Sequence, residues 1–371
     1  MSTPYVPGLE GVVAAQTEIS HVDGQNGRLI YRGGYLIEEV ANRSFEEVAY
    51  LLWNGELPNR RQLAELKEEL TGRRSLNEAA RTALRGLPVD VDPMDAIRTV
   101  LSAQGARPGC PRPTREDAVA LTAAIPTATA AYYRHQQGLE PIEPRHDLDH
   151  AANFLYMLSG EEPDPKRSRY LESYLVLLAD HGLNASTFAA RVICSTGADL
   201  WSAVLGAIGA LKGPAHGGAA TAAMAMLKRV GGPESAERFV VDTLDRHERL
   251  YGFGHRVYRT YDPRARILRE LCREANPTFY AVAYAVEEVA LRELLARHPE
   301  RPNATNVDYY SAGVLEGAGF PSHYFTCVFA ASRVVGWTAH VLEYMAREGR
   351  IIRPASEWIG PDPDRRTAAT A

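Results

Sequence analysis

Two histidines lie among glycines in this sequence, and each could polarise a carbonyl group. The first, His216, lies within Gly-Pro-Ala-His-Gly-Gly, just before a predicted helix at residues 219–230. Glycines let the backbone approach a ligand, and the positive field of a helix N-terminus favours a neutral imidazole. A neutral histidine can donate a hydrogen bond to a carbonyl oxygen and stabilise a developing enolate. Taken alone, a histidine in this context is more often an ordinary turn residue.

The second glycine-flanked histidine, His255, opens a stretch that is rich in arginine. Six arginines follow it closely: Arg256, Arg259, Arg264, Arg266, Arg269 and Arg273. The last three fit a charged helix surface that acidic neighbours balance, whereas the first three precede or begin the helix and are better candidates for binding an anion. The preceding Gly252-Phe253-Gly254 is not a dinucleotide-binding fingerprint, because the complete Gly-x-Gly-x-x-Gly after a strand is absent.

Two further segments place an ionisable group beside glycine or asparagine. His181 lies in Asp-His-Gly-Leu-Asn, and Asp308 follows Asn306 in a predicted loop. The plain structural interpretation of Asp308 is that it caps the N-terminus of a following helix. The histidines at 181, 216 and 255 lie 35 and 39 residues apart, without an HExxH motif or an adjacent ligand pair. We therefore predict no metal site.

Most of the chain has the apolar periodicity of amphipathic helices and predicts a predominantly α-helical protein. Fourteen helices are expected, at residues 45–53, 60–70, 77–85, 95–104, 115–136, 146–158, 166–180, 185–196, 200–211, 219–230, 236–249, 264–275, 278–297 and 322–347. Residues 18–21 and 28–31 flank a glycine-rich turn and predict a β-hairpin, which we expect to be peripheral. A frayed tail is expected at residues 361–371.

The composition excludes several functional classes. The 371 residues include 41 Lys and Arg against 46 Asp and Glu, so the net charge of −5 offers no basic excess for generic nucleic-acid binding. We find no run of apolar residues long enough to span a membrane and no secretory signal, and so expect a cytoplasmic location. Few of the basic residues are lysines, so an anion site must be built from arginine, whose planar guanidinium suits carboxylates.

These motifs, in this order and spacing, resemble the citrate synthase family. They are Gly-Pro-Ala-His-Gly-Gly at 213–218, Gly-Phe-Gly-His-Arg-Val-Tyr at 252–258, Asp-Pro-Arg at 262–264 and Asn-Val-Asp-Tyr-Tyr-Ser at 306–311. Supporting matches at 8–12, 19–24, 180–188 and 332–337 extend the resemblance over about residues 8–360. Several independent motifs in register are far more specific than any one of them.

The resemblance implies an acyltransferase that joins the methyl carbon of acetyl-CoA to the keto carbon of oxaloacetate and then hydrolyses the thioester, as in the tricarboxylic acid cycle. Asp308 resembles the family's base, and His216 its enolate-stabilising donor. His255 resembles the histidine that polarises the oxaloacetate carbonyl and supplies a proton to the new alkoxide. No cofactor is implied, because acetyl-CoA is a substrate.

The resemblance also implies how oxaloacetate is held. His181, Arg264 and Arg333 match residues that bind its carboxylates and keto group, which need charge-assisted donors of fixed geometry. Arg353 matches an arginine that the family donates from the other subunit, so the implied homodimer would be functional. Phe329, four residues before Arg333, matches a ring packed beside the substrate but is equally plausible as a core residue.

For the second substrate, the resemblance assigns Arg259 to a CoA phosphate and the backbone of Gly252, Phe253 and Gly254 to the adenine. The alternative for Arg259 is a solvated surface arginine.

The family fold is all-α, with a large and a smaller helical domain and a minor N-terminal β-hairpin. The large domain would comprise residues 1–217 and 312–371, and the small domain, residues 218–311, would be inserted between its halves. The small domain would close over oxaloacetate before acetyl-CoA binds, which excludes water. Asp308 would then reach the other catalytic residues only in the closed form.

The match is imperfect where Ala220 and Thr221 replace the Asn and acidic residue that the family usually has after His-Gly-Gly-Ala. Three alternatives therefore stay open. One is a 2-methylcitrate synthase that uses propionyl-CoA, since one methylene in an apolar pocket is worth only about 1–3 kcal/mol of discrimination. The others are a catalytically silent binding or regulatory protein on the same scaffold and a helical metalloprotein.

Overall fold

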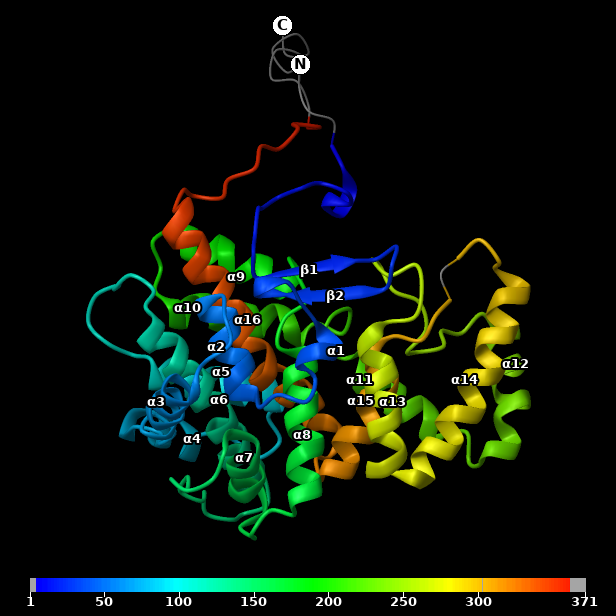
Figure 1. Ribbon diagram of the computed structural model, residues 1–371, viewed down its shortest axis with the longest axis horizontal. Helices are drawn as coiled ribbons and strands as arrows, with labels where there is room; N and C mark the ends of the chain where they lie inside the picture. Colours follow the sequence, from blue (N-terminus) through cyan, green and yellow to red (C-terminus); the bar gives the residue numbers. More distant parts are fainter. Residues whose placement is uncertain (1–4, 302, 361–371) are drawn as a thin grey trace, which may run out of the picture.

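The computed structural model describes residues 5–301 and 303–360, and within them the chain forms sixteen α-helices and one small sheet (Figure 1). The helices are α1 (Ile37–Val40), α2 (Phe45–Asn54), α3 (Arg60–Thr71), α4 (Glu78–Arg85), α5 (Pro93–Gln104), α6 (Arg115–Gln136), α7 (His150–Ser159), α8 (Pro165–Leu178), α9 (Ala185–Ser195), α10 (Leu200–Lys212), α11 (Ala219–Lys228), α12 (Ala236–Asp245), α13 (Pro263–Ala275), α14 (Pro277–Arg297), α15 (Val307–Ala318) and α16 (Phe325–Arg347). The predicted all-α class is confirmed. The tail predicted at 361–371 lies outside the described residues.

All fourteen predicted helices are present, and local capping explains why most of their starts were predictable. The side chains of Ser44, Asn59 and Thr114 each accept a hydrogen bond from a backbone N–H in the first turn of α2, α3 and α6. Gly55 and Gly160 end α2 and α7 in the left-handed conformation, which glycine adopts without steric cost.

The sequence did not predict helix α15, which carries Asp308. The helix contains two glycines, which lower helix propensity. A Cβ on Gly313 would lie 2.4 Å from the sulfur of Cys272, and one on Gly317 would lie 2.5 Å from the carbonyl oxygen of Ala275. Both neighbours belong to α13, so the glycines let α13 and α15 pack closely. Tertiary packing therefore stabilises a helix that local propensity disfavours.

The long helix α16 forms the centre of the core and packs against α6, α8, α9 and α10 (Figure 1). It is the only described helix long and apolar enough to cross a membrane, but its most apolar window is 89% buried inside the protein. A helix that is apolar all round is typical of a protein core. Arg333 and Trp337, in the middle of α16, are both buried.

The N-terminal sheet contains β1 (Ser20–Asp23), β2 (Arg28–Tyr31) and a short β3 (Tyr35–Leu36) that the sequence did not predict. All pairs are antiparallel, with Ser20 opposite Tyr31 in the hairpin. The prediction that this hairpin is peripheral is wrong. Its tip contacts the loop that follows His255, since the N–H of Arg259 donates to the carbonyl oxygen of Gly24 at 2.9 Å.

Helices α11 to α15 gather on one side of the molecule, next to α8 and α16 (Figure 1). Helix α15 contacts α8, α11 and α13, so it lies at the junction between this group and the rest. The N-terminal segment and the segment after α16 leave the body in the same direction (Figure 1). The positions of the two predicted domain boundaries stay predictions.

Candidate active site

His216 lies in the turn between α10 and α11, beside the start of α9. Its Nε2 is 2.8 Å from the hydroxyl of Ser186, which also accepts a hydrogen bond from the indole of Trp337 at 3.0 Å. Burial lowers the pKa of His216 to about 4, and the guanidinium of Arg333 acts in the same direction. The ring is therefore neutral at pH 7. The sequence predicts this state from a helix field, whereas the main causes in the structure are burial and Arg333.

The protonation of His255 is fixed by its own loop. Its Nδ1 accepts two backbone hydrogen bonds, from the N–H groups of Val257 and Tyr258, both at 3.0 Å. A neutral ring with an acceptor at Nδ1 carries its proton at Nε2. Burial, together with the charge of Arg264, lowers the pKa of His255 to about 4. His255 is thus a neutral hydrogen-bond donor through Nε2.

His181 lies close to His255, with 5.3 Å between the ring centroids. Its Nε2 is 3.3 Å from the hydroxyl of Tyr258. Burial, with the charges of Arg264 and then His255, holds the pKa of His181 well below its usual value. The neutral imidazoles of His181 and His255 and the phenol of Tyr258 therefore lie next to one another.

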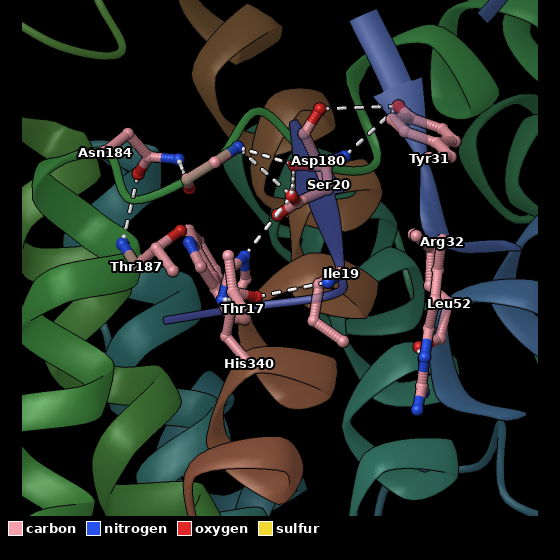
Figure 2. A network of polar contacts seen from close by, with 12 residues as sticks. Thr17, Ile19, Ser20, Tyr31, Arg32, Leu52, Asp180, Asn184, Thr187 and His340 are labelled. Atoms are coloured by element: carbon pink, nitrogen blue, oxygen red, sulfur yellow. Dashed lines mark hydrogen bonds and ion pairs between the residues drawn. The ribbon is translucent and has the colours of Figure 1, made fainter. Parts of the chain in front are cut away.

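The preceding residue, Asp180, anchors the His181 loop to the core. Its carboxylate accepts hydrogen bonds from the hydroxyl of Ser20 and from the N–H of Gly182, and it lies 3.3 Å from Nε2 of His340 on α16 (Figure 2). Asp180 and His340 are both fully buried. The main chain that carries His181 is thereby tied to both β1 and α16.

Two buried arginines give this region its positive charge. Arg264 makes a two-pronged pair with Asp262, with Nε to Oδ1 at 3.1 Å and Nη2 to Oδ2 at 2.8 Å. Arg333 donates from Nε to the carbonyl oxygen of Leu178 at 2.8 Å, and its guanidinium lies 4.8 Å from the ring centre of Phe329.

Only one of these two arginines is neutralised by a carboxylate. No carboxylate of the described residues lies within ion-pair distance of Arg333, which is 2% exposed. Burial lowers the pKa of Arg333 to about 10, so it still carries its charge at pH 7. The charge of Arg333 is opposed only from beyond ion-pair distance, by the buried carboxylate of Asp180. A buried cation without a direct partner is costly, and an anionic ligand would offset that cost.

Asp308 lies in the first turn of α15, and the alternative structural interpretation, that it caps this helix, does not hold. The cap is Asn306, whose side chain accepts the N–H of Asp308 at 3.1 Å. The Asp308 carboxylate makes no hydrogen bond with the other described residues. Burial raises the pKa of Asp308 to about 6, although the charges of Arg264 and Arg333 oppose the shift. A carboxylate with a raised pKa is a stronger base that stays ionised at neutral pH.

A short ladder of hydrogen bonds places His255 and Asp308 on neighbouring segments. The N–H of Gly254 donates to the carbonyl oxygen of Ala304, and the N–H of Asn306 donates to that of Gly252, both at 2.9 Å. The charges of Arg264 and Arg333 also act on the predicted residues as a group. Arg264 affects His181, His255 and Asp308, and Arg333 affects His181, His216 and Asp308. The six residues therefore form one electrostatic cluster around the two arginines, in which no contact among the described residues joins the His216 ring to His255 or Asp308.

A cavity of about 700 Å³ opens beside this cluster. Its lining includes Phe253, Gly254, His255 and Arg259, together with the further basic residues Arg249, Arg256 and Arg301. Gly252 lies behind the lining, where a Cβ would be 2.4 Å from the ring of Tyr309. Its φ of +92° is also a conformation that only glycine adopts readily. An apolar wall with several guanidinium groups suits a large ligand that carries phosphates.

The structure does not bring Arg353 into this cluster. It lies exposed in the extended segment that follows α16. Three residues that complete the site had no role in the sequence interpretation: Ser186, Tyr258 and Asp262. All three lie inside the motifs at 180–188, 252–258 and 262–264, but only the folded chain shows which group each one contacts.

No group of three or more His, Cys, Asp or Glu side chains in the described part of the chain could hold a metal ion.

Comparisons with known proteins agree with the resemblance. The family model described as "Citrate synthase, C-terminal domain" matches residues 8–355. A citrate synthase from Haloferax volcanii is 43% identical over 97% of both chains. A 2-methylcitrate synthase from Mycobacterium tuberculosis is 39% identical over 95% of this chain and 90% of its own.

A solved structure of the citrate synthase from Thermoplasma acidophilum, in a ternary complex with carboxymethyl coenzyme A and oxaloacetate, superimposes with a TM-score of 0.91. It is 31% identical and covers 97% of each chain. The chain therefore belongs to the citrate synthase family of acyl-transferring enzymes.

Proposed function

We propose that this protein condenses acetyl-CoA with oxaloacetate and water to give citrate and CoA. The proposal rests on one observation, the shifted pKa values of the groups around Arg333. A carboxyl group with a raised pKa, Asp308, lies in the same cluster as two histidines that are neutral at pH 7. Removing a proton next to a thioester carbonyl requires such a base together with neutral donors.

Oxaloacetate, a small dianion, would bind at the buried arginines. Arg333 has no direct ion pair among the described residues, and Arg264 has donors left after its pairing with Asp262. His181 and His255 would then face the keto group from one side. We infer that Arg353 of a second copy of the chain completes the site, as the resemblance implies, which makes the functional unit a homodimer.

The chemistry follows from the protonation states. The carboxylate of Asp308 removes a methyl proton from acetyl-CoA, and His216 donates a hydrogen bond to the thioester oxygen as it becomes an enolate oxygen. Because Ser186 contacts Nε2 of His216, Nδ1 is the nitrogen left for the substrate, and it can donate once the Ser186 hydroxyl turns its proton from Oδ1 of Asn184 to Nε2. The enolate carbon attacks the keto carbon, and Nε2 of His255 gives its proton to the new alkoxide. The two backbone N–H groups at Nδ1 stabilise the anionic ring until the proton held by Asp308 returns to it by way of water. Water then hydrolyses the thioester and releases CoA.

Coenzyme A would occupy the cavity of about 700 Å³, with Arg259 at a phosphate and residues 252–254 against the adenine. Helices α11 to α14 and the start of α15 belong to the proposed small domain, residues 218–311, whose closure would exclude water from the enolate. No separate cofactor takes part in these steps.

The decisive experiment is CoA release in the presence of oxaloacetate, measured with acetyl-CoA and with propionyl-CoA over a concentration series. A kcat/KM ratio above about ten in favour of acetyl-CoA supports the proposal, because one methylene is worth about 1–3 kcal/mol. If CoA is released from neither acyl donor, the result would instead support a catalytically silent binding protein with the same fold.

A 2-methylcitrate synthase is the second candidate, because a protein of that name is 39% identical to this chain. A kcat/KM ratio reversed in favour of propionyl-CoA would identify it. Both candidates use the same base, the same donors and the same oxaloacetate site, so the acyl donor alone separates them.

A further inference from the structure

The tip of the β1–β2 hairpin packs directly against the loop that carries His255. The carbonyl oxygen of Gly24 accepts the N–H of Arg259 at 2.9 Å. A Cβ at Gly24 would lie 2.2 Å from the carbonyl oxygen of Val257 and 2.8 Å from its carbonyl carbon. These are backbone atoms, so the loop could not relieve the contact by turning a side chain. The absence of a side chain at residue 24 is what lets the two segments touch.

The base of the same hairpin is fixed to the loop that carries His181. The hydroxyl of Ser20 accepts the N–H of Gly182 at 2.9 Å and donates to the carboxylate of Asp180 (Figure 2). From β2, the hydroxyl of Tyr31 donates to the carbonyl oxygen of Val176 at 2.9 Å and accepts the N–H of Asp180 at 3.3 Å. The hairpin thus connects two loops that are far apart in sequence, each bearing a histidine of the site.

The contact at Gly24 reaches the His255 imidazole through one residue. The peptide carbonyl of Val257 faces Gly24, and the N–H of the same residue donates to Nδ1 of His255. The next donor to Nδ1, Tyr258, also contacts His181 through its hydroxyl. A shift of residues 257–259 would therefore turn the His255 ring and move Arg259 together.

We propose that Gly24 is a positioning residue for the condensation: the hairpin tip holds residues 255–259 so that His255 and Arg259 face their substrates. This inference rests on the proposed function. Gly24 touches no substrate and acts only through the main chain of Val257 and Arg259. The turn itself is braced, because the carboxylate of Asp23 accepts the backbone N–H of Asn26 at 3.1 Å and its side-chain amide at 2.8 Å.

Substitution of Gly24 by alanine disturbs the contact with Val257 without straining the backbone of residue 24 itself. The φ of Gly24 lies outside the left-handed region, so alanine is allowed there by the local backbone. The neighbouring Gln25 is exposed and makes no hydrogen bond with the described residues, so Gln25→Ala is a matched control in the same turn.

In the Gly24→Ala enzyme we expect kcat for CoA release to fall by about 10- to 100-fold, because small misplacements of catalytic groups have costs of this size. The KM for acetyl-CoA should rise by about threefold or more as Arg259 moves. The KM for oxaloacetate should change less than the KM for acetyl-CoA, since Arg264 and Arg333 lie outside the loop and only His255 among the proposed oxaloacetate contacts moves with it. A mere loss of folded protein would lower kcat and leave both KM values unchanged. Gln25→Ala should behave as the wild type.

If wild-type enzyme turns over and Gly24→Ala keeps kcat and both KM values within about twofold, the positioning role is refuted while the proposed function stands. If the wild type is inactive with both acyl donors, the proposed function fails instead. Amide hydrogen exchange of the wild type tests the contact without any variant. The Arg259 amide should exchange at least about tenfold more slowly than that of Thr260. Equal rates would show that the hairpin tip does not hold the loop.

Discussion

The side-chain amide of Asn306 donates a hydrogen bond to the carbonyl oxygen of Gly254 at 2.9 Å. The side-chain oxygen of the same asparagine caps α15 by accepting the N–H of Asp308. One residue therefore bonds to the neighbour of His255 and to the first turn that carries Asp308. The proposed proton donor and the proposed base cannot separate unless these bonds break.

Asp308→Asn should lower kcat by about 10²- to 10⁴-fold, the usual contribution of a general base. Oxaloacetate should still bind, because the base acts on the other substrate. Burial raises the pKa of Asp308 in the folded state, so folding stability falls as the pH rises from 3.8, the ordinary pKa, to about 6 and stays at the lower level at pH 7. The variant should therefore melt at the same or a higher temperature at pH 7. Calorimetry and turnover assays would measure these effects, and lost oxaloacetate affinity with undiminished turnover would contradict the assignment.

The activity should depend on pH through Asp308. Below a pH of about 6 this carboxylate takes up a proton, so kcat/KM should fall by about tenfold per unit. His216 and His255, whose pKa values are lowered to about 4, stay neutral over this range. A pH profile from 5 to 8 should show a single acidic limb, and a flat profile would exclude Asp308 as the base.

Ser186→Ala should lower kcat by up to about 10²-fold with little change in the KM for oxaloacetate. The variant loses the hydroxyl that contacts Nε2 of His216, so the ring loses the partner that fixes its orientation and its tautomer when the substrate binds. The matched control is Thr187→Val, which removes a neighbouring buried hydroxyl that has no hydrogen-bond partner among the described residues. Equal effects of the two substitutions would refute a tautomer-setting role for Ser186.

Substitutions of the two buried arginines should both weaken oxaloacetate binding but should differ in their effect on folding stability. Arg264→Met leaves the carboxylate of Asp262 buried without its partner, which should cost about 3–5 kcal/mol of folding free energy. Arg333→Met removes a charge that has no direct ion pair among the described residues and interacts with Asp180 only from farther away, so it should destabilise less. Both should raise the KM for oxaloacetate. Chemical denaturation and steady-state kinetics would test this difference, and equal loss of stability would contradict it.

Arg353 should act across a subunit interface. Arg353→Ala should weaken oxaloacetate binding in the assembled dimer, and so should any loss of the second copy. When unfolded Arg353→Ala and His255→Ala chains are mixed and refolded, activity should return, because half of the sites in a mixed dimer carry neither change. No recovery on mixing, or full activity in a stable monomer, would place Arg353 outside the site.

The sequence determined the helices well because their ends are set by short-range chemistry. Ser44 and Asn59 cap the helices that directly follow them, and Gly55 ends α2 in a left-handed turn. The same locality made the histidine segments recognisable, since glycines next to His216 and His255 are visible without any fold. Helix α15 was missed because Gly313 and Gly317 are favourable only against α13.

What the tertiary structure alone decided is the environment of each group. The sequence predicts the same role for Arg264 and Arg333. Only the fold gives Arg264 a direct carboxylate partner and leaves Arg333 without one. Likewise the hairpin has an ordinary turn sequence, and its contact with the His255 loop depends on two segments more than 200 residues apart. Residue type and spacing fix which chemistry is possible, whereas pKa values, tautomers and contacts between distant loops depend on burial and on neighbours that only folding brings together.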